Sequence, residues 1–93
     1  MRRIRWAPAA ADDLQEILNY LREHHSALAQ PTVRKLYDLA RSLKRFPNRG
    51  RIGYKEGTRE LIVAPTPYII VYGVEREVVH IFRVIHASKE RRR

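Results

Sequence analysis

The β-rich part of the chain reads RELIVAPTPYIIVYGVEREVVHIFRVIH from residue 59 to residue 86. Within it, branched and aromatic residues concentrate in three segments, at 59–63, 68–74 and 78–86, and such residues favour β-strands. The two connections between these segments have the length of hairpin loops. Because short connections join neighbouring strands, this stretch predicts three strands in an antiparallel meander.

Two amphipathic segments precede this meander. The first, over residues 9–24, has an apolar stripe at the i, i+3, i+4 and i+7 positions, formed by Leu14, Ile17, Leu18 and Leu21. The second runs to about residue 46 and has a stripe formed by Val33, Leu36, Ala40 and Leu43. The break between the two segments is short, which predicts an antiparallel helical hairpin.

Polar residues and proline refine the two predicted helices. Ser26 is a candidate N-cap for the second helix. Pro31 lies inside the first turns if that helix begins at Ala27, and in a favourable first-turn position if it begins at Gln30. Three carboxylates are expected on the solvent side of the first helix: Asp12, Asp13 and Glu16.

Within residues 2–6, Arg3 and Arg5 alternate with Ile4 and Trp6, which predicts a short strand that ends before Pro8. The predicted order is therefore β-α-α-β-β-β. The fold class is α+β with two layers, in which the helical hairpin packs on one face of a mainly antiparallel sheet. A chain of 93 residues fills one core, so we expect residues 1–93 to form a single domain, with residues 87–93 as a basic tail.

The composition excludes several classes of chemistry. No cysteine occurs, which excludes disulfides, thiolate metal sites and cysteine nucleophiles. His24 and His25 have no further metal-ligand residues at a useful spacing, and no glycine-rich phosphate loop is present, so we expect neither a metal nor a cofactor. No apolar run approaches the ~20 residues of a membrane helix. We therefore expect a cytoplasmic protein without a membrane partner.

The formal net charge is +9, which for a chain of this size predicts a polyanion or an acidic protein as partner. Residues 1–43 have seven basic and five acidic side chains, whereas residues 44–93 have twelve and five. One loop of the second half combines four cations with an aromatic ring: Arg49, Arg51, Tyr54, Lys55 and Arg59. Mixed guanidinium and aromatic groups suit phosphate contact and base stacking, and the same composition is also typical of a solvated loop.

Three residues of the β-rich stretch are further site candidates. Arg83 stands among apolar neighbours, so it either pairs with a carboxylate, for which Glu60 is the candidate, or projects toward an anionic ligand. His86 ends its strand, where it could serve as a general acid or base or be a surface or capping histidine. Tyr68 either packs at the rim of a central strand or lies near a bound nucleotide or partner.

Short motifs follow one another along nearly the whole chain. They are Trp6 to Ala10 with Asp12, Asp13, Leu14 and Ile17; Leu43 to Pro47 followed by Gly50 and Arg51; Gly57 to Leu61; Pro67 to Tyr72; and Phe82 to His86. In this order and spacing, the chain resembles toxins of the RelE/ParE superfamily from bacterial type II toxin–antitoxin systems. The resemblance implies the same β-α-α-β-β-β fold and a neutralising antitoxin. Together with the net charge, it predicts an acidic, partly disordered antitoxin anchored in apolar grooves beside the helical hairpin.

The ParE branch is the closer resemblance, through residues 57–61, 68–72 and 83–86. Members of that branch act on DNA gyrase rather than as nucleases, so the resemblance implies a growth-inhibiting toxin directed at gyrase. Such a toxin needs no general base. We assign contact with the partner or with nucleic acid to the basic loop residues together with Tyr68, Lys89 and Arg91.

The RelE branch is the alternative, and it cleaves messenger RNA in the ribosomal A site without a metal. In that branch an arginine commonly follows the aromatic residue that opens the third strand, and here the position is Ile69. If the chain is such an endoribonuclease, the implied catalytic residues are Arg59, Arg83 and His86. A second alternative is a non-toxic basic nucleic-acid-binding module, which would bind naked DNA or RNA with a steep salt dependence.

Overall fold

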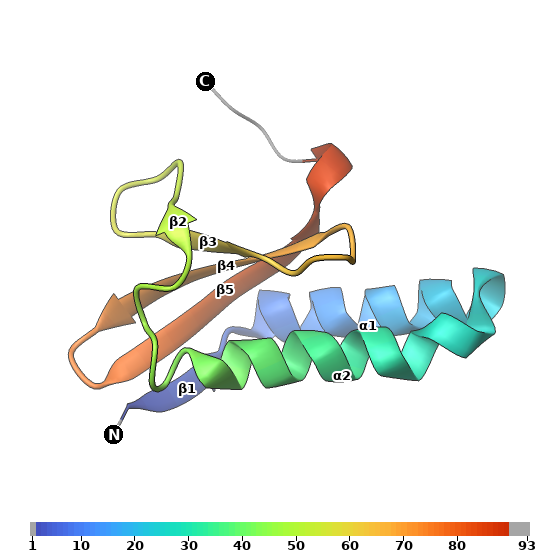
Figure 1. Cartoon of the computed structure of the whole chain (residues 1–93), viewed down its shortest axis with the longest axis horizontal. Coiled ribbons are helices and arrows are strands. Elements are labelled where there is room, and N and C mark those ends of the chain that lie inside the picture. The colour runs from blue at the N-terminus through green and yellow to red at the C-terminus, as the bar shows by residue number, and fades with distance from the viewer. Residues whose placement is uncertain (1, 90–93) are drawn as a thin grey trace.

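Two helices pack on one face of a five-stranded mixed sheet in the structure, a computed structural model in which residues 2–89 are described (Figure 1). The helices are α1 (Pro8–His24) and α2 (Ser26–Ser42), and a short 3-10 helix, η1 (Ala87–Lys89), follows the last strand. The strands are β1 (Arg3–Trp6), β2 (Arg51–Ile52), β3 (Arg59–Ile62), β4 (Tyr68–Glu75) and β5 (Val78–His86).

The strand order across the sheet is β1-β5-β4-β3-β2. β1 pairs with β5 in parallel, and the other pairings are antiparallel. The predicted α+β class, the helical hairpin and the meander of the last three strands are therefore confirmed. Each of those three strands lies within one residue of its predicted bounds.

Three local predictions were wrong. β2 was missed because two paired residues are too few for a hydrophobic period. α2 ends at Ser42 rather than near residue 46, and it begins at Ser26, so that Pro31 lies inside the helix. Ser26 is not the N-cap, because that position belongs to His25, which makes no side-chain capping hydrogen bond.

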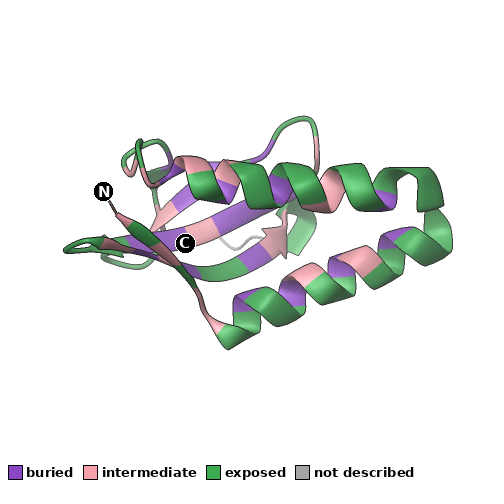
Figure 2. Ribbon diagram, turned by 90° about the horizontal axis from the view of Figure 1, so that it is seen from below, coloured by how far each residue is buried: buried purple, intermediate pink, exposed green. Residues whose placement is uncertain are grey.

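The core lies between the helical hairpin and the sheet. Side chains of β4 alternate, so that Tyr68, Ile70 and Tyr72 face the helices. They meet buried side chains of α2, of which Leu36 is completely inaccessible to solvent. Burying a leucine of this kind contributes about 1.5–3 kcal/mol. Figure 2 shows the consequence for the helices, whose buried residues follow the side that faces the sheet.

The helical hairpin is longer than the sheet that it covers, and its far end projects beyond the strands (Figure 1). Neither α1 nor α2 covers the opposite face of the sheet (Figure 1). The fold therefore offers two surfaces of different kinds: a recess beneath the helices, lined by residues of α1, α2 and the sheet, and an open sheet face.

Candidate functional site

The loop after α2 is fixed by two side chains from the sheet. The Tyr72 hydroxyl donates to the Pro47 carbonyl at 2.7 Å and accepts from the Gly50 N–H at 2.9 Å. Arg59 Nη1 donates to the Gly50 carbonyl at 2.7 Å. Burial raises the pKa of Tyr72 despite the Gly50 N–H and the nearby charge of Arg59, so the hydroxyl stays protonated and able to donate. Arg59, a predicted site residue, thus has a structural role in this loop.

Arg51 is held by the strand next to it. It lies opposite Glu60 in the β2–β3 pairing, and its guanidinium contacts Glu60 Oε1 through Nε at 2.9 Å and Nη2 at 2.8 Å. The Glu60 side chain is almost completely buried. A buried carboxylate needs such a partner, because an uncompensated charge is costly away from water. Arg51 therefore neutralises Glu60.

Arg83 joins β5 to α1. Its Nε and Nη2 donate to the two carboxylate oxygens of Asp13 at 2.8 and 3.0 Å, and the Val84 N–H donates to Asp13 Oδ2 at 2.9 Å. β1 pairs with β5 only as far as Ile81. Beyond that point the Asp13 carboxylate, in place of a β1 residue, accepts the hydrogen bond from the Val84 N–H of β5. Burial raises the pKa of Asp13, but the hydrogen bonds from Arg83 and Val84 outweigh it and hold that pKa below its usual range.

Two predictions about these charges were wrong. Arg83 does not pair with Glu60, because β4 lies between them and each has a nearer partner of opposite charge. Asp13 is not a solvated surface residue, since it is buried on the stripe of α1 that also contains Ala10, Ile17 and Leu21. This spacing is the signal that would have identified it, because position 13 lies four residues before Ile17 on the same helix face.

His86 is tied to the turn that follows it. Its Nδ1 accepts from the Ser88 N–H at 3.0 Å and lies 2.8 Å from the Ser88 hydroxyl. The imidazole also packs edge-on against Tyr68, with ring centroids 5.5 Å apart. Because the backbone N–H of Ser88 can only donate, Nδ1 must carry a lone pair. His86 therefore caps η1, as one of its two sequence interpretations held.

The remaining predicted contact residues are spread over the surface. Tyr54, Lys55 and Lys89 are exposed, and Arg49 donates to the Ser42 hydroxyl at 3.0 Å. Tyr68 is buried beneath the far end of α1, which fits the rim-packing interpretation. Arg91 lies outside the described residues.

The predicted catalytic residues lie on different strands, Arg59 on β3 and Arg83 and His86 on β5, and the loop cation Arg51 lies on β2. Arg51 and Arg83 lie at the same level of the sheet, but two strands separate them, which places their backbones about 14 Å apart at normal strand spacing. Arg59 is next to Glu60 on β3. Its side chain shares a face of the strand with the buried Leu61, and this is the face that the helices cover. Each of these cations also has its own partner in the fold: Glu60 for Arg51, the Gly50 carbonyl for Arg59 and Asp13 for Arg83.

The recess beneath the helical hairpin is a groove of about 1130 Å³. Its walls are α1, the start of α2, the β3–β4 loop and the end of β5. Tyr20 and Leu28 are large apolar side chains at its rim, each more than half exposed. His25, Lys35 and Lys89 add basic groups. Sequence reasoning expected an apolar groove here but did not identify Tyr20 and Leu28, which lie off the stripes used to predict the helices.

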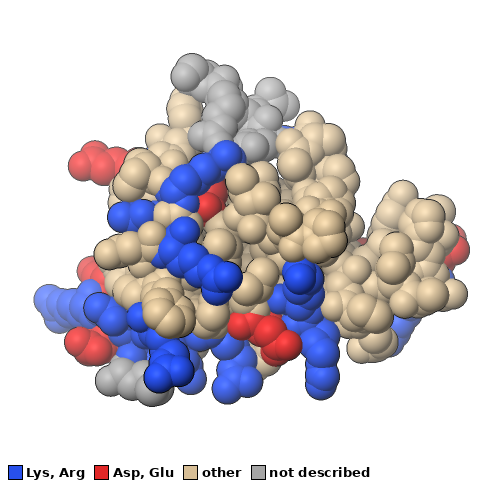
Figure 3. All heavy atoms as spheres, viewed as in Figure 1, with Lys and Arg blue, Asp and Glu red and all other residues tan. Residues whose placement is uncertain are grey.

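Basic side chains also gather at the other end of the molecule, where β1 begins and α2 ends (Figure 3). Exposed arginines in this region include Arg3, Arg5, Arg45 and Arg76. Within residues 2–89, no group of three or more His, Asp or Glu side chains could hold a metal ion. Neither described α-helix has the length and apolar character to cross a membrane.

Comparison with known proteins gives a consistent result. Residues 4–91 match the family described as ParE toxin of type II toxin–antitoxin system, parDE. The toxin RelE2 of Caulobacter vibrioides is 37% identical over 89 residues, which cover 96% of this chain and 99% of that protein. The Sinorhizobium fredii protein Y4kP is 36% identical over 89 residues, 96% of this chain and 92% of that protein.

Solved structures share the fold at lower sequence identity. A chain of the chromosomal ParDE system from P. aeruginosa superposes with a TM-score of 0.84 at 21% identity, covering 92% of this chain and 96% of that one. The E. coli DinJ–YafQ complex contains a chain with a TM-score of 0.61 at 17% identity, covering 95% and 96%.

Proposed function

The chain belongs to the ParE toxin family of type II toxin–antitoxin systems, and from this premise we propose that it arrests growth by acting on DNA gyrase in the cytoplasm. One observation carries the choice of gyrase over messenger RNA. The two arginines implied as catalytic, Arg59 and Arg83, and the neighbouring loop cation Arg51 are each engaged in a contact within the fold.

Metal-free RNA cleavage needs cations that are free to stabilise charge on the transferring phosphate, and loss of one preorganised contact typically costs ~10²–10³ in rate. Asp13 already neutralises Arg83, and Arg59 donates to loop carbonyls. Proton transfer at Nδ1 of His86 would break the cap on η1. These commitments disfavour a nuclease and support a toxin that acts by binding.

Supercoiling by purified gyrase tests the target. Relaxed plasmid, gyrase and ATP are incubated with increasing amounts of the toxin, and the topoisomers are resolved on a gel. We expect supercoiling to fall with toxin dose and to recover when the antitoxin is added. Full supercoiling at a toxin concentration that arrests growth in cells would contradict gyrase as the target.

We further propose that the antitoxin is an acidic protein whose amphipathic segment lies in the groove beneath the helical hairpin. The apolar rim of Tyr20 and Leu28 would anchor one face of such a segment, and Lys35 and Lys89 would attract its carboxylates. Among the solved structures that share the fold is the toxin–antitoxin complex DinJ–YafQ. The net charge of +9 would speed association more than it would strengthen the complex.

Co-expression with the neighbouring reading frame tests this partner. Leu28→Asp places a charge in the groove and should release the antitoxin, because the apolar anchor is lost. Ile52→Asp is the matched control, since Ile52 is 70% exposed and lies on the edge strand β2, which does not line the groove. Equal loss of the complex in both variants, or in neither, would contradict the groove as the docking site.

A further inference from the structure

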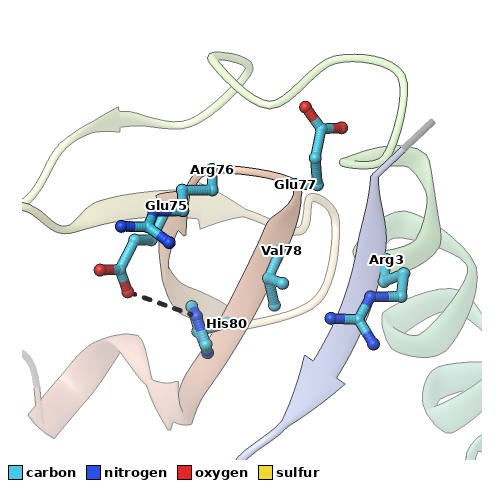
Figure 4. Close-up of a pocket in the computed structure, with 6 residues that line it drawn as sticks. All are labelled: Arg3, Glu75, Arg76, Glu77, Val78 and His80. Carbon is cyan, nitrogen blue, oxygen red and sulfur yellow. Dashed lines mark ion pairs between the residues drawn. The ribbon is translucent and has the colours of Figure 1, made fainter.

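A second hollow, of about 550 Å³, lies at the β4–β5 turn and plays no part in the groove or the loop contacts described above. It is lined by Arg3, Glu75, Arg76, Glu77, Val78 and His80 (Figure 4). Arg3 pairs with Val78 and Arg5 with His80 in the parallel β1–β5 register. Side chains of such paired residues point to the same face of a sheet, and the alternative face of β1 carries Trp6, which stacks on Tyr37 of α2. The hollow therefore lies on the open sheet face.

The cations on this face contrast with those of the loop. Arg3 and Arg76 line the hollow, and Arg5 lies two residues from Arg3 on the same face of β1. Arg3, Arg5 and Arg76 are exposed, and none of them forms an ion pair with another residue in the 2–89 range. Figure 4 shows the guanidinium of Arg3 directed into the space beside Val78, with Arg76 on the far side of the hollow. Unpaired guanidinium groups on one face are suited to contact with phosphates.

Arg76 occupies an unusual backbone position. Its φ is +57°, in the left-handed region that glycine adopts without cost and that other residues seldom adopt. It is the first of the two residues that connect β4 to β5, where a hairpin turn favours glycine. The chain therefore has an arginine at a position where glycine would be less strained, which suggests a role for the Arg76 side chain.

Two parallel rings, those of His80 and Phe82, adjoin these cations and are called the aromatic ledge. The rings of His80 and Phe82 are parallel to within 6°, with centroids 6.1 Å apart. Gly73 lies beneath Phe82, and a Cβ there would approach the phenyl ring and the Gly57 carbonyl to 2.9 Å. The absence of a side chain at position 73 thus lets the ring lie against the backbone. Phe82 remains 39% exposed, so the ledge is available to a flat ligand.

The two acidic residues of the hollow leave the cations accessible. Glu75 has its carboxylate 3.9 Å from Nε2 of His80, so it faces the imidazole. Glu77 points away from the hollow in Figure 4. The guanidinium of Arg3 lies beside Val78, and that of Arg76 is directed away from Arg3, on the side of Glu75 (Figure 4).

We propose that this face binds a single-stranded polynucleotide, with phosphates on Arg3, Arg5 and Arg76 and a base stacked on the His80–Phe82 ledge. Stacking on an aromatic side chain requires a base that is free of its duplex partner. The surface offers contacts to phosphate and to the base face, so RNA and DNA strands of one sequence should bind alike. This proposal is independent of gyrase inhibition, because binding is measured without gyrase or ribosomes.

Fluorescence anisotropy tests it with the full-length chain purified away from its antitoxin. The probes are a labelled 12-nucleotide DNA strand of mixed sequence, the RNA of the same sequence, and the DNA duplex. We expect both single strands to bind with similar affinity and the duplex about tenfold more weakly or worse. Phe82→Ala should weaken single-strand binding about tenfold, the size of a lost base stack, and Phe82→Leu should do so too while retaining apolar contact.

Charge variants separate the site from general attraction to a basic protein. Arg76→Gly removes the guanidinium and relieves the backbone, so it should weaken binding without lowering the melting temperature. Arg5→Gln should reduce the slope of log K against log salt by about 0.7, as expected for one phosphate contact on a single strand. Arg22→Gln, at the exposed end of α1, is the control for loss of one charge and should change binding less than twofold.

Three results would overturn the proposal. They are binding of the duplex as tightly as the single strands, an effect of Arg22→Gln equal to that of Arg76→Gly, and unchanged affinity in both Phe82 variants. Absence of single-strand binding at low salt would overturn it as well, whatever the gyrase assay shows.

Discussion

The arginines of the loop and of β5 differ from those at the β4–β5 turn, although composition alone treats all of them as surface charge. Arg51, Arg59 and Arg83 donate to Glu60, to loop carbonyls and to Asp13. Among the described residues, Arg3, Arg5 and Arg76 of the open sheet face form no ion pair. The nearby acidic residues are Glu75, which faces His80, and Glu77. Whether an arginine is free to contact a ligand therefore depends on the hydrogen-bond acceptors that pack beside it.

The largest test of this comparison is Asp13→Ala. The substitution removes the ion pair and leaves the buried Val84 N–H without an acceptor, so we expect a loss of about 3 kcal/mol in the free energy of unfolding. In a domain of this size the melting temperature should fall by more than ~10 °C. Asp12→Ala is the matched control, because Asp12 is exposed, and it should change stability by less than about 0.5 kcal/mol. Equal effects of the two substitutions would contradict the role given to Asp13.

Arg83→Ala tests the same pair from its other side. Asp13 would keep the Val84 N–H but lose its counter-charge, and because the Arg83 side chain is 54% exposed, we expect a loss of about 1–2 kcal/mol, below the cost of breaking a fully buried pair. Growth arrest should persist at temperatures where the variant stays folded. An unchanged melting temperature with loss of growth arrest would instead place Arg83 in contact with the target.

Lowering the pH should reproduce part of the loss of stability expected for Asp13→Ala. The folded-state pKa of Asp13 lies below its unfolded value, so the unfolded chain binds the proton more readily in the acid range. The contribution of Asp13 is therefore complete at neutral pH and is lost as pH falls below the unfolded pKa, about 3.9, toward the folded pKa. Urea unfolding of the wild type and Asp13→Asn at pH 7 and pH 3 measures this. The stability difference between the two proteins should shrink in acid, and a constant difference would refute the linkage.

The smallest expected effect belongs to Arg76→Gly. Relief of the positive φ should be offset partly by the greater backbone entropy of glycine in the unfolded chain, so we expect a stabilisation of less than about 1 kcal/mol. Chemical denaturation resolves a change of this size. A clear loss of stability would show that the Arg76 side chain supports the fold, which would weaken its assignment to a ligand.

The sequence predicted the architecture because periodicity carries it. The branched and aromatic residues of β4 and β5 and the apolar stripes of α1 and α2 each extend over a whole element, so local errors average out. β2 could not be found in this way, because only two residues are paired and both are exposed. β2 is a strand only because it pairs with β3, and pairing with another segment leaves no periodic pattern in its own two residues.

The site was less predictable for a related reason. A charge among apolar residues signals a partner but does not identify it, as Arg83 illustrates: its partner is 70 positions away in sequence, on α1. Asp13 itself stood on a buried helix stripe, and its charge led to its assignment to solvent. Arg76 gave no sequence signal, because the positive φ depends on the turn that the two strands impose.

We propose that this family member arrests growth without cutting RNA, because Arg51, Arg59 and Arg83 are engaged in contacts within the fold. Ribosomes programmed with a defined messenger RNA test it most directly, with the toxin added at doses that inhibit supercoiling and the RNA 5′ ends mapped by primer extension. We expect the messenger RNA to remain intact. Defined A-site cleavage products that disappear in His86→Ala or Arg83→Ala variants, with the variants shown to be folded, would contradict it.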